Sequence, residues 1–443
     1  MNFRKSVFQI ALPVTIQSLV QASFSVIDQI MTGQLGSVSV AAIGLGGKFS
    51  SLFSVVVSAI ATVAGILFAQ YIGSGDKNGV SRMFTVNSGV ISAISVVFQV
   101  LSMTIPLQIM SLYSKDTSTI AAAASYLFII AIGFLPQALS LLMSSLFRCQ
   151  GNAGFPLFAS LIAAGINTAL NYLLIFGRLG MPELGIEGAA IATTISRFAE
   201  FLILAIFLLL KIKRSEFSLR FTRSQKSGEF KMFMCILLPM FATEFLWSLG
   251  ENVYAVIYGR IGTDACAAMT LTNPIQSLMI GAMTGLSAAS GIIVGKMLGE
   301  GKEDEAYINS KKFIKYGFIG SIALSAVLMV SRSLYVEIFN VNDNVKNLTR
   351  LILIAYAIIA PIKVENMILG GGIIRSGGKT KYIMMVDIIG TWGFGVPLGL
   401  ISAFVLNLPI YAVYFILSLE ECVRFAITLF IFKRKKWMNK LAA

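Results

Sequence analysis

Two glutamates, Glu244 and Glu251, lie seven residues apart in the apolar stretch PMFATEFLWSLGENVYAVIYG. Seven residues are about two turns of a helix, so both carboxylates are expected on one helix face. A charge at bilayer depth costs about 2.5–3.5 kcal/mol on insertion scales, and such residues are therefore candidates for function. Carboxylates in apolar surroundings can bind a cation or take up a proton.

A second acid, Asp28, lies deep in an apolar stretch near the N-terminus, with no basic residue within a helical turn or two. Elsewhere in the same half, INTALNYLLIFG places Asn167 and Asn171 four residues apart on one face, and IATTIS contains Thr193 and Thr194. One carboxylate with amide and hydroxyl oxygens could bind a small hard cation such as Na⁺. The same carboxylate, once desolvated, could instead take a proton. Hydrogen bonding between helices is the purely structural alternative.

In the second half, PIKVENMILGGG contains Lys363 and Glu365, which are two residues apart and therefore point to different sides of a helix. Lys363 is expected to reach across to Glu251 or Glu244. Acids facing a cleft would attract cationic, amphiphilic compounds, and Trp247 beside them offers cation–π contact.

Other charges within apolar stretches have a simpler interpretation. Arg197 and Glu200 are three residues apart, and Glu420 and Arg424 are four residues apart. At either spacing the acid and the base can form an ion pair within one helix. Asp387 lies near the end of an apolar stretch, where headgroups could solvate it.

Composition sets the class of protein. Of 443 residues 56% are hydrophobic and only 13% charged, with a mean hydropathy of +0.81, whereas soluble proteins have about 25% charged residues. Continuous apolar runs of 18 or more residues indicate an all-α membrane protein rather than a barrel of short alternating segments. The sequence contains no histidine, and its four cysteines form no CxxC motif, so neither a zinc site nor a disulfide framework is indicated.

The apolar runs predict twelve transmembrane helices. We place them at residues 8–33, 46–72, 84–112, 120–147, 155–177, 186–211, 232–258, 270–298, 313–339, 348–374, 381–405 and 409–432.

The net charge of +14 follows from where lysine and arginine lie. Loops and adjoining span ends on the side of the N-terminus hold 25 of the 35, the opposite side holds seven, and three lie inside spans. This asymmetry is the positive-inside signal rather than a nucleic-acid groove, so we expect a multi-pass protein of the inner (plasma) membrane with both termini cytoplasmic.

The two halves of the chain resemble each other. At a shift of 226 residues GQLGSVSVAA falls on GRIGTDACAA, and Gly65, Gly73 and Gly75 fall on Gly291, Gly299 and Gly301. A repeat that preserves membrane orientation predicts two pseudo-symmetric six-helix bundles around a central cavity. We expect an N-lobe at 1–210, a cytoplasmic loop at 211–231 and a C-lobe at 232–443, which ends in a basic tail.

Several motifs, in order and with consistent spacing, resemble the multidrug and toxic compound extrusion (MATE) family of secondary antiporters. They are SVIDQIMTGQLG, AQYIGSGD, LFRCQGNAGFP, INTALNYLLIFG, GIEGAAIAT and IRSGGKTKY. The resemblance covers essentially the whole chain.

This resemblance implies a cation site in the N-lobe at Asp28, Asn167, Asn171 and Thr193, with Pro13 at a helix bend. Asn171 is an aspartate in one branch of the family, so a scheme with two aspartates does not transfer to this chain. The acid of the tenth helix corresponds to Glu365. For the seventh helix, Glu244 and Glu251 lie about one turn on either side of the matching position.

The expected function is therefore Na⁺- or H⁺-coupled antiport of organic, cationic or amphiphilic solutes, by alternating access of two lobes in a monomer. The alternative within transporters is a flippase for lipid-linked oligosaccharides or peptidoglycan precursors. Such a protein should present arginine and lysine to pyrophosphate, whereas the cleft candidates here are mainly acidic. An enzyme would need a nucleophile or metal cluster, so we expect neither catalysis nor a cofactor beyond the coupling ion.

Overall fold

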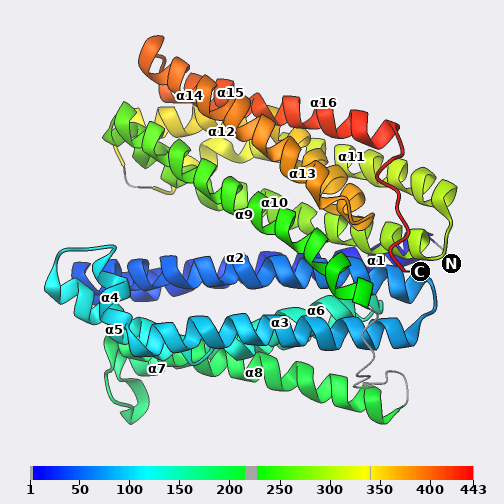
Figure 1. Ribbon diagram of the computed structural model, residues 1–443. Coiled ribbons are helices and arrows are strands. Elements are labelled where there is room, and N and C mark those ends of the chain that lie inside the picture. Colours follow the sequence, from blue (N-terminus) through cyan, green and yellow to red (C-terminus); the bar gives the residue numbers. More distant parts are fainter. Residues whose placement is uncertain (1–2, 215–226, 340, 443) are drawn as a thin grey trace. The chain divides into compact units, whose positions relative to one another are not determined.

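The computed structural model describes residues 3–214, 227–339 and 341–442, and these residues form helices joined by short turns (Figure 1). Residues 215–226 of the loop expected at 211–231 lie outside the described residues. The α-helices are α1 (Phe3–Thr32), α2 (Ser37–Gly73), α3 (Lys77–Thr104), α4 (Pro106–Ser111), α5 (Thr117–Ala131), α6 (Phe134–Cys149), α7 (Gly154–Phe176), α8 (Gly185–Lys213), α9 (Ser227–Ile261), α10 (Thr263–Gly299), α11 (Glu303–Glu337), α12 (Asp343–Asn366), α13 (Thr380–Asp387), α14 (Val396–Leu400), α15 (Ile410–Ser418) and α16 (Glu420–Lys433).

The helices are long and apolar enough to cross a membrane. Within the described residues nine pass that test, and up to ten if the bent pair α5 and α6 forms one span. The remaining expected spans, 186–211 and 409–432, lie on α8 and on the pair α15 and α16. The prediction of an all-α, multi-pass membrane protein is confirmed.

Two of the expected spans are broken beside a proline. In the span expected at 84–112, helix α3 ends at Thr104 and α4 begins at Pro106. Proline has no backbone N–H with which to continue the helical hydrogen bonds. The span at 120–147 is divided into α5 and α6, which meet at an angle of 48° beside Gly133 and Pro136. By contrast, Pro13 lies inside α1, which continues through it to Thr32.

Three π-helical segments interrupt the last third of the chain: η3 (Met367–Ile374), η4 (Ile388–Gly395) and η5 (Ile401–Val405). Segment η3 contains the Gly370–Gly372 triplet. A Cβ at Gly372 would overlap the Ser290 hydroxyl of α10. The triplet therefore permits the close helix contact that glycine allows in membranes.

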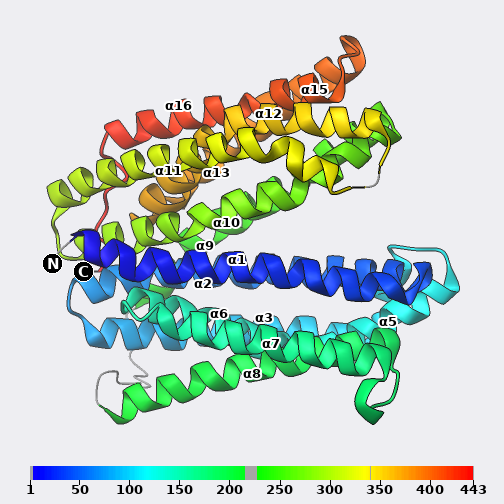
Figure 2. The ribbon, with the colours of Figure 1, turned by 180° about the vertical axis from the view of Figure 1, so that it is seen from behind.

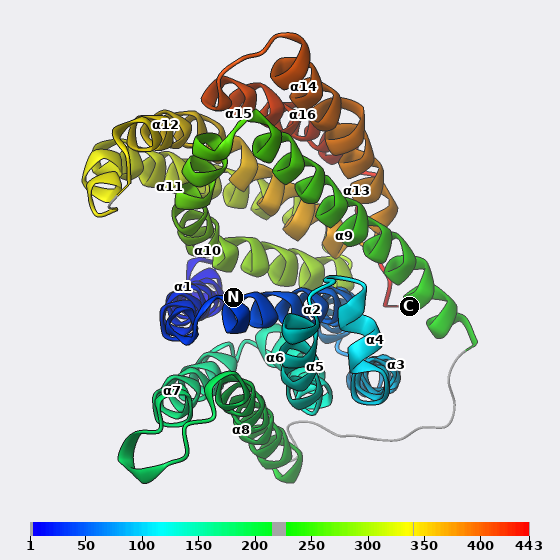
Figure 3. The same ribbon diagram turned by 90° about the vertical axis from the view of Figure 1, so that its left-hand side faces the viewer.

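The chain forms two compact units. Unit 2 comprises Ile16–Phe68 and Asp76–Phe230. Within it α7 packs against α8, and Figure 3 shows the two helices as neighbours seen nearly end-on. The rings of Phe53 and Phe134 stack at 4.2 Å in its apolar interior.

Unit 1 comprises Met1–Thr15, Ala69–Gly75 and Lys231–Ala443. Helix α11 lies against α12, and α10 packs on both (Figure 2). A buried apolar core that includes Tyr254, Ile352 and Val413 joins α9, α12 and α15. The units thus follow the chain halves except at two short segments, and the expected functional division at residues 211–231 stays a prediction.

The internal repeat predicted from the glycines has a structural counterpart. Helices α2 and α10 each have 37 residues. They begin and end 226 positions apart, at Ser37 and Thr263 and at Gly73 and Gly299. After them Gly75 and Gly301 both adopt a left-handed conformation, with φ of 76° and 77°. The halves therefore repeat helix lengths and turns as well as sequence.

Candidate functional site

The polar residues predicted in the N-terminal half meet within unit 2. The Asn171 Nδ2 group donates to the Asp28 carboxylate at 2.6 Å and to the Asn167 oxygen at 3.3 Å. The Asn167 amide in turn donates to the Thr193 hydroxyl at 3.4 Å. The four predicted residues, from α1, α7 and α8, thus form one hydrogen-bonded group.

The hairpin of α7 and α8 positions three of these residues. Helix α7 ends at Phe176, and the left-handed conformation of the next residue, Gly177, turns the chain. The Leu184 N–H then donates to the Leu174 carbonyl at 2.8 Å. Gly188 lies so close to Leu174 that a Cβ there would contact the backbone at 2.6 Å. This close packing aligns Asn167 and Asn171 with Thr193 on the facing helix.

The oxygens of this group suit a small hard cation. The Asn171 side chain is fully buried, and its Oδ1 has no hydrogen-bond partner among the described residues. Buried polar atoms are normally paired, so an unpaired oxygen next to a carboxylate suits an ion or a proton-bearing partner. Carboxylate, amide and hydroxyl oxygens are the donor types that hard cations prefer.

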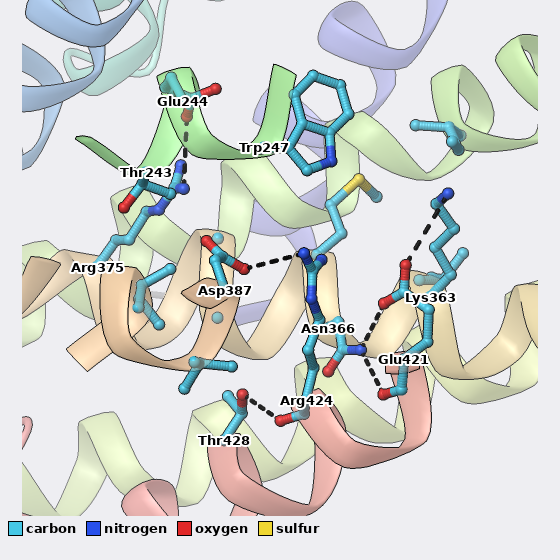
Figure 4. A pocket seen from close by; sticks show the side chains of 17 residues that line it. Thr243, Glu244, Trp247, Lys363, Asn366, Arg375, Asp387, Glu421, Arg424 and Thr428 are labelled. Carbon is cyan, nitrogen blue, oxygen red and sulfur yellow. Dashed lines mark hydrogen bonds and ion pairs between the residues drawn. The ribbon is translucent and has the colours of Figure 1, made fainter. Parts of the chain in front are cut away.

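A cavity of about 290 Å³ lies in unit 1 among α9, α12, α13 and α16 (Figure 4). Three acidic and three basic side chains line it: Glu244, Asp387, Glu421, Lys363, Arg375 and Arg424. Trp247, Ile280 and Met367 supply apolar surface on its wall.

Every basic side chain in this cavity has an acidic partner across a helix interface. Arg375 lies 3.4 Å from Glu244 and Arg424 3.6 Å from Asp387. The Lys363 ammonium is 3.9 Å from Glu421. The cavity, which we call the paired-charge cavity, is therefore balanced in formal charge rather than acidic.

Neutral polar groups support these pairs. The Asn366 amide donates to the Glu421 carbonyl and carboxylate, both at 2.8 Å, and Arg424 also donates to the Thr391 hydroxyl. Three polar atoms of the cavity have no hydrogen-bond partner among the described residues, namely Arg375 Nε, Arg424 Nε and Asn366 Oδ1.

Some of the expected contacts in this half are different in the structure. Lys363 was predicted to reach Glu251 or Glu244, yet its ion-pair partner is Glu421. Arg424 pairs with Asp387 on another helix rather than with Glu420, and Glu420 accepts a 2.6 Å hydrogen bond from the Tyr254 hydroxyl. Both differences have one cause, because the partners become neighbours only when α9, α12, α13 and α16 pack together.

Glu244 and Glu251 line different cavities. Glu244 belongs to the paired-charge cavity, whereas Glu251 lines a second cavity of about 240 Å³ with Tyr254, Tyr258 and Tyr414. Lys363 and Glu421 line both cavities.

Glu365 occupies a different environment, because neither cavity includes it. Its side chain is 2% exposed, and neither carboxylate oxygen has a hydrogen-bond partner among the described residues. It faces Gly317 of α11, where a Cβ would lie 2.6 Å from Glu365 Oε1. The sequence predicted a functional acid here, and the structure shows a buried carboxyl group in an apolar site.

Sequence reasoning did not assign Glu421, Asp387, Arg375 or Arg424 to a site. Asp387 was placed near headgroups, but its side chain is only 15% exposed beside Arg424. A count of charged residues in the last four expected spans would have shown nearly equal numbers of acidic and basic side chains.

The MatE family model matches the chain twice, at residues 13–173 and 239–401. The chain belongs to the MatE family. The resemblance predicted from the motifs is thus confirmed, and the two matched segments coincide with the two halves of the repeat.

Relatives and solved structures agree over almost the whole length. The chain is 23% identical to the uncharacterized transporter YisQ of Bacillus subtilis, over 98% of this chain and 95% of the relative. It is 24% identical to a probable multidrug resistance protein NorM of Thermotoga maritima, over 99% and 94%. A crystal structure of MATE in complex with MaL6 superimposes with a TM-score of 0.91 at 18% identity, covering 99% and 97%. A MOP superfamily transporter from Pyrococcus furiosus superimposes with a TM-score of 0.89 at 18% identity, covering 99% of this chain and 97% of that chain.

Proposed function

We propose that this MatE-family protein is a multidrug exporter that couples the efflux of organic solutes to the entry of Na⁺ or H⁺. The observation that carries the proposal is the hydrogen-bonded group of Asp28, Asn171, Asn167 and Thr193 within apolar helices. A carboxylate at such a depth is costly unless it binds something, and a coupling ion is what an antiporter requires. Relatives named as multidrug resistance proteins support the efflux direction.

The geometry suggests how the ion would bind. The Asn171 amide now points its N–H at Asp28, while its oxygen has no partner. If that amide rotates, its oxygen joins the carboxylate, the Asn167 oxygen and the Thr193 hydroxyl as ligands for Na⁺. Binding of a proton requires no such rotation, because a protonated Asp28 carboxyl group can itself donate a hydrogen bond to a neighbouring oxygen. The two ions therefore make different demands on Asn171.

Glu365 is the second acid of the proposal. Its unpartnered carboxyl group is buried in the C-terminal half, where neutralisation by a proton or a cation would remove a large desolvation penalty. Neutralising an acid in each half would shift the equilibrium between the two orientations of the lobes. Coupling requires that these two orientations differ in their affinity for the ion. We place the protein in the plasma membrane as a monomer, with both termini cytoplasmic.

The flippase alternative needs an excess of basic side chains for pyrophosphate. The paired-charge cavity does contain Lys363, Arg375 and Arg424, more bases than the sequence suggested, but each has an acid within 4 Å. This balance favours an amphiphilic solute over a dianionic headgroup.

The test is efflux of ethidium from proteoliposomes under an imposed Na⁺ gradient and then an H⁺ gradient. Asp28→Asn should fold normally and lower gradient-driven efflux at least tenfold, whereas Asp343→Asn, at an exposed helix end, should leave it unchanged. Efflux that ignores both gradients would reject ion coupling, and full efflux by Asp28→Asn would reject the assignment of Asp28.

A further inference from the structure

The tail that follows α16 folds back on α11 through a stack of three aromatic rings. The rings of Tyr307 and Phe432 stack at 4.8 Å, and those of Phe432 and Trp437 at 5.8 Å. The Trp437 side chain is fully buried, and its Nε1 donates to the Phe432 carbonyl at 3.2 Å. Figure 1 shows the tail passing the end at which α11 begins. The stack therefore fixes the residues that follow α16 against the first turns of α11.

Two ammonium groups lie on the ring of Tyr307. The Lys311 Nζ and the Lys435 Nζ are each 4.6 Å from its centroid. Phe432 covers one face of this ring, which leaves the other face for the cations. Two nitrogens at this distance from one point are at most twice that distance apart. A phosphate group, whose oxygens accept charged hydrogen bonds of about 2.7–2.9 Å, is wide enough to bridge them.

The positive charge of the two lysines is only weakly compensated. Lys311 has no acidic partner among the described residues, and the Lys435 ammonium lies 3.5 Å from the Asp304 carboxylate. This contact joins exposed groups, since 93% of the Asp304 side chain and 47% of the Lys435 side chain are accessible, and such pairs contribute little. Like charges held close together on one ring favour the binding of an anion between them.

The face of α11 that carries Lys311 continues into the apolar part of this helix, which is long enough to cross a membrane. Lys311, Lys315, Phe318 and Ile322 follow one another at intervals of four, three and four residues, so they share one face. Phe318 is 48% exposed and Ile322 46%, so other helices do not cover this face. At 1.5 Å per residue, Lys311 lies about 10 Å from Phe318 along the axis, which places it at headgroup level when Phe318 contacts acyl chains.

A phospholipid is the source of phosphate that fits both parts of this surface. A soluble phosphate would use the lysines alone, whereas a phospholipid also covers the exposed apolar side chains of α11. Choline or ethanolamine headgroups would bring a further ammonium next to Lys311 and Lys435, and like charges repel each other. An anionic headgroup such as that of phosphatidylglycerol carries no such cation, and basic clusters at the ends of membrane helices attract anionic lipids.

We propose that Lys311 and Lys435, over the free face of Tyr307, bind the phosphate of an anionic phospholipid whose acyl chains lie along Phe318 and Ile322. Because one lysine belongs to α11 and the other to the tail, the lipid would hold the tail to α11 at the membrane surface. This inference goes beyond the proposed function, since it concerns neither the coupling ion nor the exported solute.

Two phospholipids with the same acyl chains test the assignment on the purified full-length protein in detergent. Native mass spectrometry should give phosphatidylglycerol a Kd about fivefold lower than that of phosphatidylcholine, because only the headgroups differ. Inorganic phosphate at the same concentration should not displace phosphatidylglycerol, because it lacks acyl chains. Equal affinity for the two lipids would overturn the proposal. Displacement by inorganic phosphate would also overturn it, in favour of a site for a soluble phosphate.

Charge-removing variants locate the site. Lys311→Gln and Lys435→Gln should each raise the Kd for phosphatidylglycerol about threefold and leave that for phosphatidylcholine unchanged. Lys312→Gln removes the same charge from the next residue of α11, but the Lys312 ammonium lies over the Phe3 ring of α1, so this control should change neither value. Equal weakening by Lys312→Gln would mean that net charge alone attracts the lipid, and would reject the site.

Asp304→Asn should move the affinity in the opposite direction. Removal of this carboxylate frees Lys435 for the phosphate, so the Kd for phosphatidylglycerol should fall about twofold. Damage to the fold would weaken binding and therefore does not produce this result. Unchanged or weaker binding of phosphatidylglycerol by Asp304→Asn would contradict the assignment.

Discussion

Asn171 of α7 donates its amide to the carboxylate of Asp28 in α1 at 2.6 Å, so the side chain next to the acid is a neutral amide rather than a second acid. This pair predicts how the coupling ion can be changed. In Asn171→Asp two carboxylates would share the site, and like charges at this distance favour holding one proton between them. We expect efflux to depend more on an H⁺ gradient and less on a Na⁺ gradient than in the native protein. The ratio of the efflux rate under an H⁺ gradient to the rate under a Na⁺ gradient should rise by about an order of magnitude.

The measurement is efflux from proteoliposomes under each gradient separately. Asn347→Asp makes the same substitution on an exposed surface and should leave the ratio unchanged. An unaltered ratio in Asn171→Asp would show that Asn171 takes no part in ion selection.

Gly73 and Gly299 make reciprocal contacts and allow a prediction about stability. A Cβ at Gly73 would overlap the Lys296 carbonyl, and a Cβ at Gly299 would overlap the Gln70 carbonyl, which is the equivalent position in the repeat. Neither backbone can move away without breaking helix hydrogen bonds. Gly73→Ala or Gly299→Ala should therefore destabilise the protein by about 1–3 kcal/mol, the usual cost of overpacking.

Thermal unfolding in detergent measures this effect as a lower Tm. Gly44→Ala is the matched control in the same helix as Gly73, because no atom lies within 4 Å of its Cβ position and alanine favours helix. The prediction fails if Gly73→Ala melts no lower than Gly44→Ala.

Gln70 holds the end of the chain to unit 1. Its amide donates to the carbonyls of Ser376 and Asn439 at 2.8 and 3.0 Å, and its oxygen accepts from the Leu441 N–H at 2.6 Å. Since Gln70 is fully buried, Gln70→Ala would leave these backbone groups unpaired, at a cost of about 1–3 kcal/mol each.

We expect Gln70→Ala to lower Tm and to expose the segment after Lys436 to carboxypeptidase, while Gln108→Ala on an exposed helix face does neither. A tail that remains protected in Gln70→Ala would mean that other contacts, such as those of the buried Trp437, suffice to hold it.

The structure brings together all four polar residues that the sequence grouped in the N-terminal half, but only some of those that it grouped in the C-terminal half. Asn167 and Asn171 share a face of one helix, so the 3.6-residue period was enough to bring them together. Asp387 and Arg424 are on different helices and 37 residues apart, and they meet because α13 packs against α16. Local patterns contain no signal for that packing, and the pairing of Arg424 with a neighbour in its own helix was therefore the wrong expectation.

Asp116 caps α5 outside the membrane-spanning segments and predicts an acid-dependent stability. Hydrogen bonds from Thr119 and Ser118 lower the pKa of its carboxyl from 3.8 to about 2. Because the folded pKa lies below the unfolded one, the ionised cap stabilises the folded state above about pH 4. This contribution is lost as the pH falls toward 2.

In Asp116→Asn the cap remains, since asparagine is also a favoured N-cap, but it no longer titrates. The variant should match the native Tm at pH 7 and lose less Tm than the native protein between pH 4 and 2. Parallel acid profiles of the two proteins would show that this cap contributes nothing measurable.

Substitution of Glu365 should affect stability and transport in different ways. A buried carboxyl group without a hydrogen-bond partner among the described residues is unfavourable for folding, so Glu365→Gln should unfold at the same Tm as the native protein or a higher one. If the same group binds a coupling ion, the variant should lose gradient-driven efflux by at least tenfold. Glu303→Gln, at the exposed start of α11, makes the same change without either effect. A variant that melts lower and still transports would assign Glu365 to the fold, because only a functional acid is retained at a cost to stability.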